Sequence, residues 1–102
     1  MIVYEVNLEV DAAVADAFRA WLSGHVREIL ALPGFLGAQV LERRDPPPAA
    51  GQHALCVQYR LADQASLDHY LRHDAPRLRA EGQARFGGSF SASRRVLGTL
   101  TL

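Results

Sequence analysis

The sequence contains no lysine and carries no net charge. All 11 basic residues are arginine, and they balance 11 acidic residues. We attribute the missing lysine to genome composition, since arginine has replaced it at every position rather than in one motif. A balanced chain offers no bulk attraction for nucleic acid or for an anionic membrane surface. We therefore expect neither as a partner.

Cysteine and long apolar runs are scarce as well. Cys56 is the only cysteine, so no disulfide can form within the chain, and a free cysteine inside an apolar run is typical of a buried thiol. No stretch approaches the roughly 18 apolar residues of a membrane span. Residues 1–5 lack the basic region that precedes the apolar segment of an export signal. We expect a cytoplasmic protein.

What is present is typical of a globular domain. The chain has 102 residues, of which 49% are hydrophobic and 22% charged. This length suits one domain, since domains commonly have roughly 100 to 150 residues. We therefore predict a single domain over residues 1–102.

The arrangement depends on the break at Pro33-Gly34. Proline cannot continue a helix, and glycine permits the backbone angles of a sharp reversal. Before the break, strict alternation predicts a strand over 2–10, and a period of 3.6 predicts a helix over 12–30 with Asp11 as its N-cap. After it, residues 35–42 are expected to form a strand whose buried face is ambiguous.

The second half repeats this order. Residues 43–51 contain three consecutive prolines, which predict an exposed loop. Alternation predicts strands over 53–61 and 90–97, and Asp63 is the expected cap of a helix over 63–86 that is broken around Asp74 to Pro76. An apolar tail follows at 98–102 and is expected to pair with another segment. The order β-α-β-β-α-β predicts an α+β, ferredoxin-like fold, with two helices on one face of an antiparallel sheet.

The first helix has an unusual residue in its apolar stripe. His25 lies among Phe18, Trp21 and Ile29. An imidazole in such a stripe is either a general base or ligand contact in a cleft, or a core histidine paired with a backbone carbonyl or tyrosine hydroxyl. Both interpretations stay open, and His25 is the best candidate for a catalytic residue.

The sequence resembles an uncharacterised bacterial domain-of-unknown-function family over nearly its whole length. The resemblance rests on Tyr4, Trp21, His25-Val26, Val57-Gln58-Tyr59, Tyr70-Leu71, Ala75-Pro76-Arg77-Leu78-Arg79, Arg85-Phe86-Gly87 and Arg95. It implies a ferredoxin-like fold of the dimeric α/β-barrel type, without an established activity.

A more distant similarity links the chain to antibiotic-biosynthesis-type monooxygenases and haem-degrading dimeric barrels. The haem degraders use an asparagine on the first strand, which Asn7 matches, and a tryptophan and histidine on a later helix. Tyr70 and Ala80 occupy those two positions here. The haem-binding histidine is therefore missing, and we predict no cofactor.

We expect a ligand site in the cleft between the sheet and the helices. Its predicted residues are Trp21, His25, Tyr59, Tyr70, Arg79 and Phe86. No metal site is expected, because His69 and His73 have a suitable i, i+4 spacing but lack a third ligand. A guanidinium group at Arg79 or Arg85 could hold a carboxylate, or its stem could simply cover apolar surface.

Three functions follow from these residues. The first is binding of a small organic molecule in the cleft. The alternatives are a cofactor-independent monooxygenase or isomerase of the dimeric-barrel kind, and a structural or interaction dimer. In each case we expect a homodimer, because a two-layer domain leaves one sheet face uncovered. Pairing of the faces was expected to place Glu5 and Glu9 of one chain near Arg60 or Arg95 of the other.

Overall fold

The computed structural model describes all residues from 1 to 102. Its elements, in chain order, are β1 (Ile2–Asp11), η1 (Ala12–Val14), α1 (Ala15–Leu30), β2 (Phe35–Glu42), β3 (Gln52–Leu61), α2 (Gln64–His73), α3 (Ala75–Phe86), η2 (Gly87–Ser89) and β4 (Phe90–Gly98). The predicted order of strands and helices is confirmed. The predicted break in the second helix is the boundary between α2 and α3.

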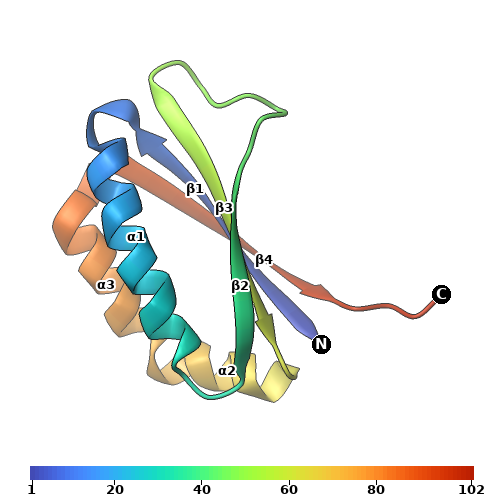
Figure 1. Cartoon of the computed structure of the whole chain (residues 1–102). Helices are drawn as coiled ribbons and strands as arrows, with labels where there is room; N and C mark the ends of the chain where they lie inside the picture. The colour runs from blue at the N-terminus through green and yellow to red at the C-terminus, as the bar shows by residue number, and fades with distance from the viewer.

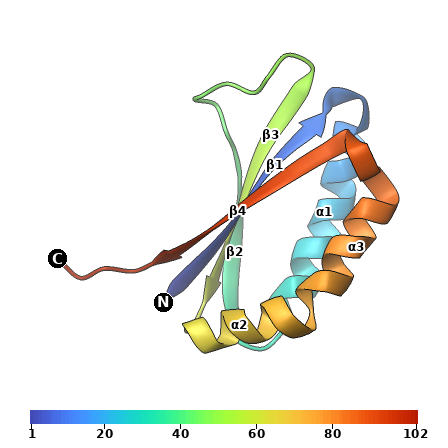
Figure 2. The same ribbon diagram turned by 180° about the vertical axis from the view of Figure 1, so that it is seen from behind.

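The strands form one antiparallel sheet in the order β2-β3-β1-β4. All the helices lie against one face of this sheet, and the other face carries none (Figure 1). The same layers are visible from behind in Figure 2, where α1 and α3 run side by side. This is the predicted ferredoxin-like α+β fold.

The break after α1 lies where the sequence predicts it. The helix ends at Leu30, and Gly34 has φ 85°. A Cβ atom at Gly34 would lie 2.4 Å from the side chain of Ser66, so glycine is required here both by the backbone angle and by the close approach of α2. A bulge between Phe35 and Gly37 then sets the register of β2. This register places Val40 opposite Val57, a core residue. Val40 therefore lies on the helix-facing side of β2, which was the orientation that the sequence left ambiguous.

The two predicted helix caps differ in outcome. Asp63 caps α2 as expected, because its carboxylate accepts a hydrogen bond from the Ser66 backbone N–H at 2.8 Å. The prediction for Asp11 is wrong. Asp11 is still part of β1 and accepts a hydrogen bond at 3.2 Å from Gln52, its neighbour on β3. The chain enters α1 through the η1 turn, which has no side-chain cap.

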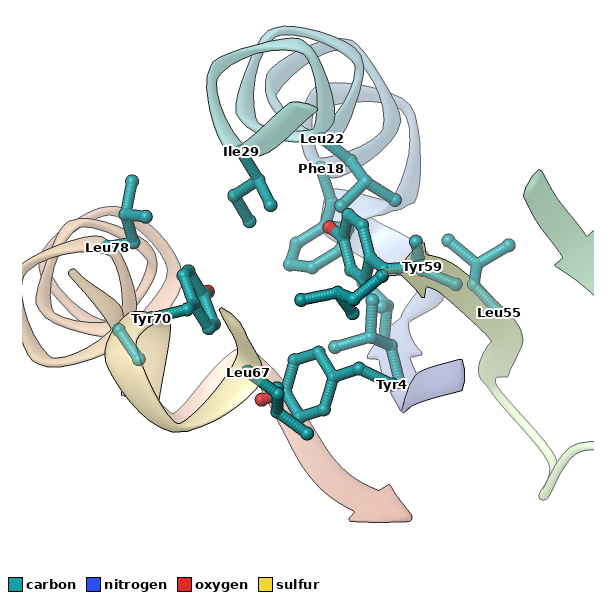
Figure 3. Packing of buried hydrophobic residues seen from close by; sticks show 14 residues of the cluster. Tyr4, Phe18, Leu22, Ile29, Leu55, Tyr59, Leu67, Tyr70 and Leu78 are labelled. Carbon is teal, nitrogen blue, oxygen red and sulfur yellow. The ribbon is translucent and has the colours of Figure 1, made fainter. Parts of the chain in front are cut away.

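The core fills the space between the sheet and the helices. Its buried side chains come from every layer (Figure 3). Tyr4 of β1 and Tyr59 of β3 extend from the sheet into this space, and Tyr70 enters it from α2 (Figure 3). Tyrosines in a core bring polar hydroxyls among apolar walls, so this layer is more polar than an aliphatic core.

The uncovered sheet face corrects one detail of the predicted dimer. Glu5 is only 3% exposed, and its carboxylate pairs with Arg95 of the same chain at 2.6 Å. Glu9 pairs with Arg43 of the same chain at 3.1 Å. Arg95 lies on the adjacent strand β4 and Arg43 directly follows β2, so neither carboxylate needs an arginine from a second copy.

The apolar tail pairs only at its start. The Thr99 backbone N–H donates to the Met1 carbonyl at 3.1 Å. Beyond this bond Leu100 and Leu102 are exposed. The tail runs past the end of the sheet, near the N-terminus (Figure 1).

Candidate functional site

A cavity of about 350 Å³ lies between the sheet and the pair of helices α1 and α3. Of its 18 lining residues, 13 are hydrophobic. The polar side chains are few: His25, Arg79, Gln83 and Arg94, with the hydroxyls of the tyrosines. An apolar cavity with a small number of polar groups is the usual form of a site for a small organic molecule.

Five of the residues predicted for the site lie together around this cavity. They are Trp21, His25, Tyr59, Tyr70 and Arg79. Phe86, the sixth, is not part of the cavity wall. It lies on the last turn of α3, where its ring packs against Phe18 and Trp21 with centroids 5.0 and 5.7 Å apart. Phe86 therefore supports the wall from behind.

Trp21 and His25 form one aromatic unit on α1. They are four residues apart, so they lie on successive turns of one helix face. Their rings stack with centroids 4.4 Å apart and an interplanar angle of 25°. Gly82 of α3 permits this position of the indole, because a Cβ there would come within 3.1 Å of Trp21. The absence of a side chain at Gly82 thus lets α3 approach Trp21 closely.

His25 has a buried ring nitrogen without a partner. Its Nδ1 atom makes no hydrogen bond, although buried polar atoms in proteins are nearly always paired. Burial lowers the pKa of His25, an effect that the charge of Arg94 strengthens and those of Glu28 and Glu81 oppose. The imidazole is therefore neutral at pH 7, and one ring nitrogen is available as an acceptor.

Three tyrosines, Tyr4, Tyr59 and Tyr70, line the cavity. Tyr4 stacks on Tyr59 at 6.1 Å and meets Tyr70 edge-on at 5.9 Å. Burial raises the pKa of Tyr70 to about 12 and raises the pKa of Tyr59 still further. Both phenols are therefore neutral at pH 7. The Tyr4 hydroxyl accepts a hydrogen bond from Arg79 Nη2 at 3.0 Å, which fixes this guanidinium group at the cavity.

Arg94 and Gln83 also line the cavity, and the sequence did not identify them as site residues. Arg94 pairs with Val6 in the sheet, and Phe90 and Ala92 precede it on the same, helix-facing side of β4. The alternation of Phe90, Ala92 and Arg94 along β4 could have identified Arg94 as a residue that faces the cavity. Using this pattern requires knowing which side of β4 faces the helices, and the sequence did not decide this.

The other candidate residues lie away from the cavity. His69 and His73 lie on the exposed side of α2, with their rings tilted by 37° and the ring centroids 4.4 Å apart. No group of three or more histidine, cysteine, aspartate or glutamate residues is placed to hold a metal ion. Asn7 is on the uncovered face of the sheet, where it donates to Glu5 at 2.9 Å. It therefore cannot act in the cavity together with Tyr70.

The fold and the cavity define a small ferredoxin-like protein with an aromatic pocket. The chain matches the domain of unknown function DUF4286 over residues 1–100 and belongs to this family. Its membership confirms the resemblance to a family of unknown function. No curated protein matches the sequence.

Solved structures with the same fold include oxygenases and a haem degrader. A candidate antibiotic biosynthesis monooxygenase from Deinococcus radiodurans superposes with a TM-score of 0.69 at 14% identity, over 100% of this chain and 97% of that one. SnoaB, a cofactor-independent oxygenase from Streptomyces nogalater, gives 0.67 at 13%, over 99% and 95%. The heme-degrader MhuD from Mycobacterium tuberculosis, with two hemes bound in its active site, gives 0.68 at 20%, over 99% and 97%. At these identities the similarity shows the fold alone.

The helices are too short or too polar for a bilayer. None of them has the length and apolar character that crossing a membrane requires.

Proposed function

We propose that the protein binds a small, largely apolar organic molecule in the cavity between the sheet and the helices. The observation that carries this proposal is the buried Nδ1 atom of His25, which has no partner among apolar walls. Leaving such an atom unpaired costs about 1–3 kcal/mol. A rotation of the ring that turns Nδ1 toward the cavity would let a polar group on a ligand remove this cost.

The volume of the cavity limits the size of the ligand. At about 350 Å³ it lies at the small end of ligand pockets, which span roughly 300–1,000 Å³. A dry cavity of about 150 Å³ accepts benzene. The cavity therefore suits one or two aromatic rings with small substituents.

A thermal-shift screen of organic acids, quinols and haem tests this function. We expect compounds with one or two rings to raise the melting temperature of the wild-type protein. The variant His25→Phe keeps the stack on Trp21 and removes the unpaired nitrogen. It should be as stable as the wild type, or up to about 1 kcal/mol more stable, and should lose most of the ligand-induced shift.

The control is His69→Phe, which removes an imidazole from the exposed side of α2. This variant should respond to the same compounds as the wild type. An unchanged response in His25→Phe would show that His25 only packs against Trp21. If no compound raised the melting temperature of the wild-type protein, the proposed function would be contradicted.

A second candidate function is that of a cofactor-independent oxygenase. The neutral imidazole of His25 favours it, because a neutral histidine with a free nitrogen can take a proton from a bound phenol or quinol. SnoaB, a cofactor-independent oxygenase, shares the fold. Oxygen consumption measured with bound quinols tests this candidate. Wild-type turnover that His25→Phe abolishes would support this candidate. Binding without oxygen uptake would contradict it and leave binding as the only function.

We also propose a homodimer formed through the uncovered sheet face and the apolar tail. β2 and β4 are the edges of the sheet. They carry the exposed apolar side chains Leu41 and Leu97, and the tail after β4 adds Leu100 and Leu102. Such edges are generally paired or covered in native proteins. Light scattering at micromolar concentration should report twice the mass of the chain. A monomer at every concentration would count against the dimer.

A further inference from the structure

We infer that the ligand of this cavity is an aromatic carboxylate whose charged group is held by Arg79 and Arg94. The inference rests on the proposed function and names the class of molecule that the site selects. Its basis is the presence of two guanidinium groups, both without a carboxylate partner, in the wall of one aromatic cavity.

Arg79 is held in place by a neutral group. Its Nη2 atom donates to the Tyr4 hydroxyl at 3.0 Å, and the side chain forms no ion pair. A guanidinium group has five N–H donors, so a single bond to Tyr4 leaves others for a ligand. The bond reduces the freedom of the side chain and thus the entropy lost on binding an anion.

Arg94 approaches the same cavity from β4. It forms neither an ion pair nor a side-chain hydrogen bond within the chain, while Arg95, which follows it, is paired with Glu5 on the opposite face. Arg94 shares the cavity wall with His25 and Tyr70.

The acidic groups nearby are already engaged. Glu28 of α1 and Glu81 of α3 lie 3.1 and 3.8 Å from Arg77 Nη1, and Asp74 lies 3.4 Å from Arg77 Nη2. None of these three carboxylates lines the cavity, whose charged side chains are Arg79 and Arg94. Arg79, Arg94 and the unpaired Arg85 are all exposed, and of the three only Arg79 and Arg94 line the cavity.

The aromatic lining of the cavity determines which kind of group can carry the carboxylate. The aromatic side chains that face the cavity are Tyr4, Phe18, Trp21, Tyr59, Tyr70 and Phe90. A free inorganic anion would leave these walls uncovered, whereas a flat ring system covers them and stacks. A planar carboxylate attached to that ring matches the fork of donors on an arginine.

Calorimetry with matched probes tests the inference. The probes are benzoate and phenol, naphthoate and naphthol, and inorganic phosphate, all at pH 7. The wild-type protein should bind at least one carboxylate about tenfold or more tightly than its neutral phenol counterpart, as expected for a charge-assisted hydrogen bond. Phosphate should bind more weakly than that carboxylate.

The variant Arg94→Gln should lose this preference and keep its affinity for the neutral phenols, which report an intact cavity. Arg85→Gln makes the same charge change on the exposed side of α3 and should retain the preference. Equal wild-type affinities for a carboxylate and its phenol would overturn the anion class and leave binding in the cavity standing. Binding of phosphate as tightly as the aromatic acids would overturn the aromatic class. Absence of binding by all five probes would contradict the proposed function itself.

Discussion

Replacement of Phe18 by alanine should lower the free energy of unfolding by about 3–5 kcal/mol. Phe18 is 1% exposed and lies at the centre of an aromatic cluster. Its ring centroid is 5.0 Å from that of Phe86, 5.2 Å from Phe90 and 5.5 Å from Trp21. Alanine would remove a ring that contacts β4, α1 and α3 together, so the neighbours could not close the space fully.

Chemical denaturation of the purified protein measures this effect, and Phe86→Ala provides the control. Phe86 is partly exposed and touches the cluster from outside, so its loss should cost clearly less than the loss of Phe18. Because Phe18 also lines the cavity, Phe18→Ala should accept larger ring systems than the wild type does. Equal losses in the two variants would contradict the central role of Phe18.

The fold was predictable because its signals are local. Pro33-Gly34 ends α1 through backbone constraints alone, and Gly34 adopts the positive φ that only glycine adopts freely. Asp63 caps α2 through a contact three residues away. Alternation in β1 and β3 fixed their inner faces. In each case the cause and its effect lie within one element, so periodicity and turn chemistry were sufficient.

The wrong predictions concern residues whose partners lie on other strands of the sheet or directly after them. Aspartate is a residue type that commonly caps helices, but the Asp11 side chain accepts a hydrogen bond from Gln52, a residue 41 positions away. The charges of Glu5 and Glu9 were assigned to a second copy because the order of the strands was unknown. Once β4 lies next to β1, Arg95 is directly opposite Glu5 and satisfies it within the chain.

The sequence predicted most of the aromatic part of the candidate site and one of its two arginines, Arg79. Trp21, His25, Tyr59 and Tyr70 could be placed in the cleft because they are on apolar faces of predicted elements. Arg94 could not, since its facing depends on the register between β4 and β1. The second arginine of the cavity therefore became evident only from the pairing of the sheet.

The second large effect concerns Glu5, whose carboxylate is buried on the uncovered face of the sheet. Arg95 Nε donates to it at 2.6 Å, Asn7 Nδ2 at 2.9 Å and Gln58 Nε2 at 3.0 Å. The bond from Arg95, followed by those from Gln58 and Asn7, lowers the pKa of Glu5 from 4.5 to about 2. Because the folded state has the lower pKa, this stabilisation is complete above pH 4.5 and is lost as the pH falls toward 2.

At pH 7, Glu5→Gln should lower the free energy of unfolding by about 1–3 kcal/mol, since the amide replaces an ionised acceptor of three donors. The difference from the wild type should shrink steadily below pH 4.5, because the unfolded wild-type chain then takes up a proton at Glu5, while the folded state does so only near pH 2. Denaturation curves between pH 2 and 7 measure both effects. Glu9→Gln is the control: Glu9 is 41% exposed and pairs only with Arg43, so its loss should cost less than about 1 kcal/mol.

The same experiment separates the ion pair from the proposed dimer. All three donors to Glu5 belong to its own chain, so the loss in Glu5→Gln should be independent of protein concentration. A loss that grew with protein concentration would indicate that Glu5 also has a partner in a second copy. A difference from the wild type that stayed constant down to pH 2 would show that the carboxylate contributes through packing rather than through its charge.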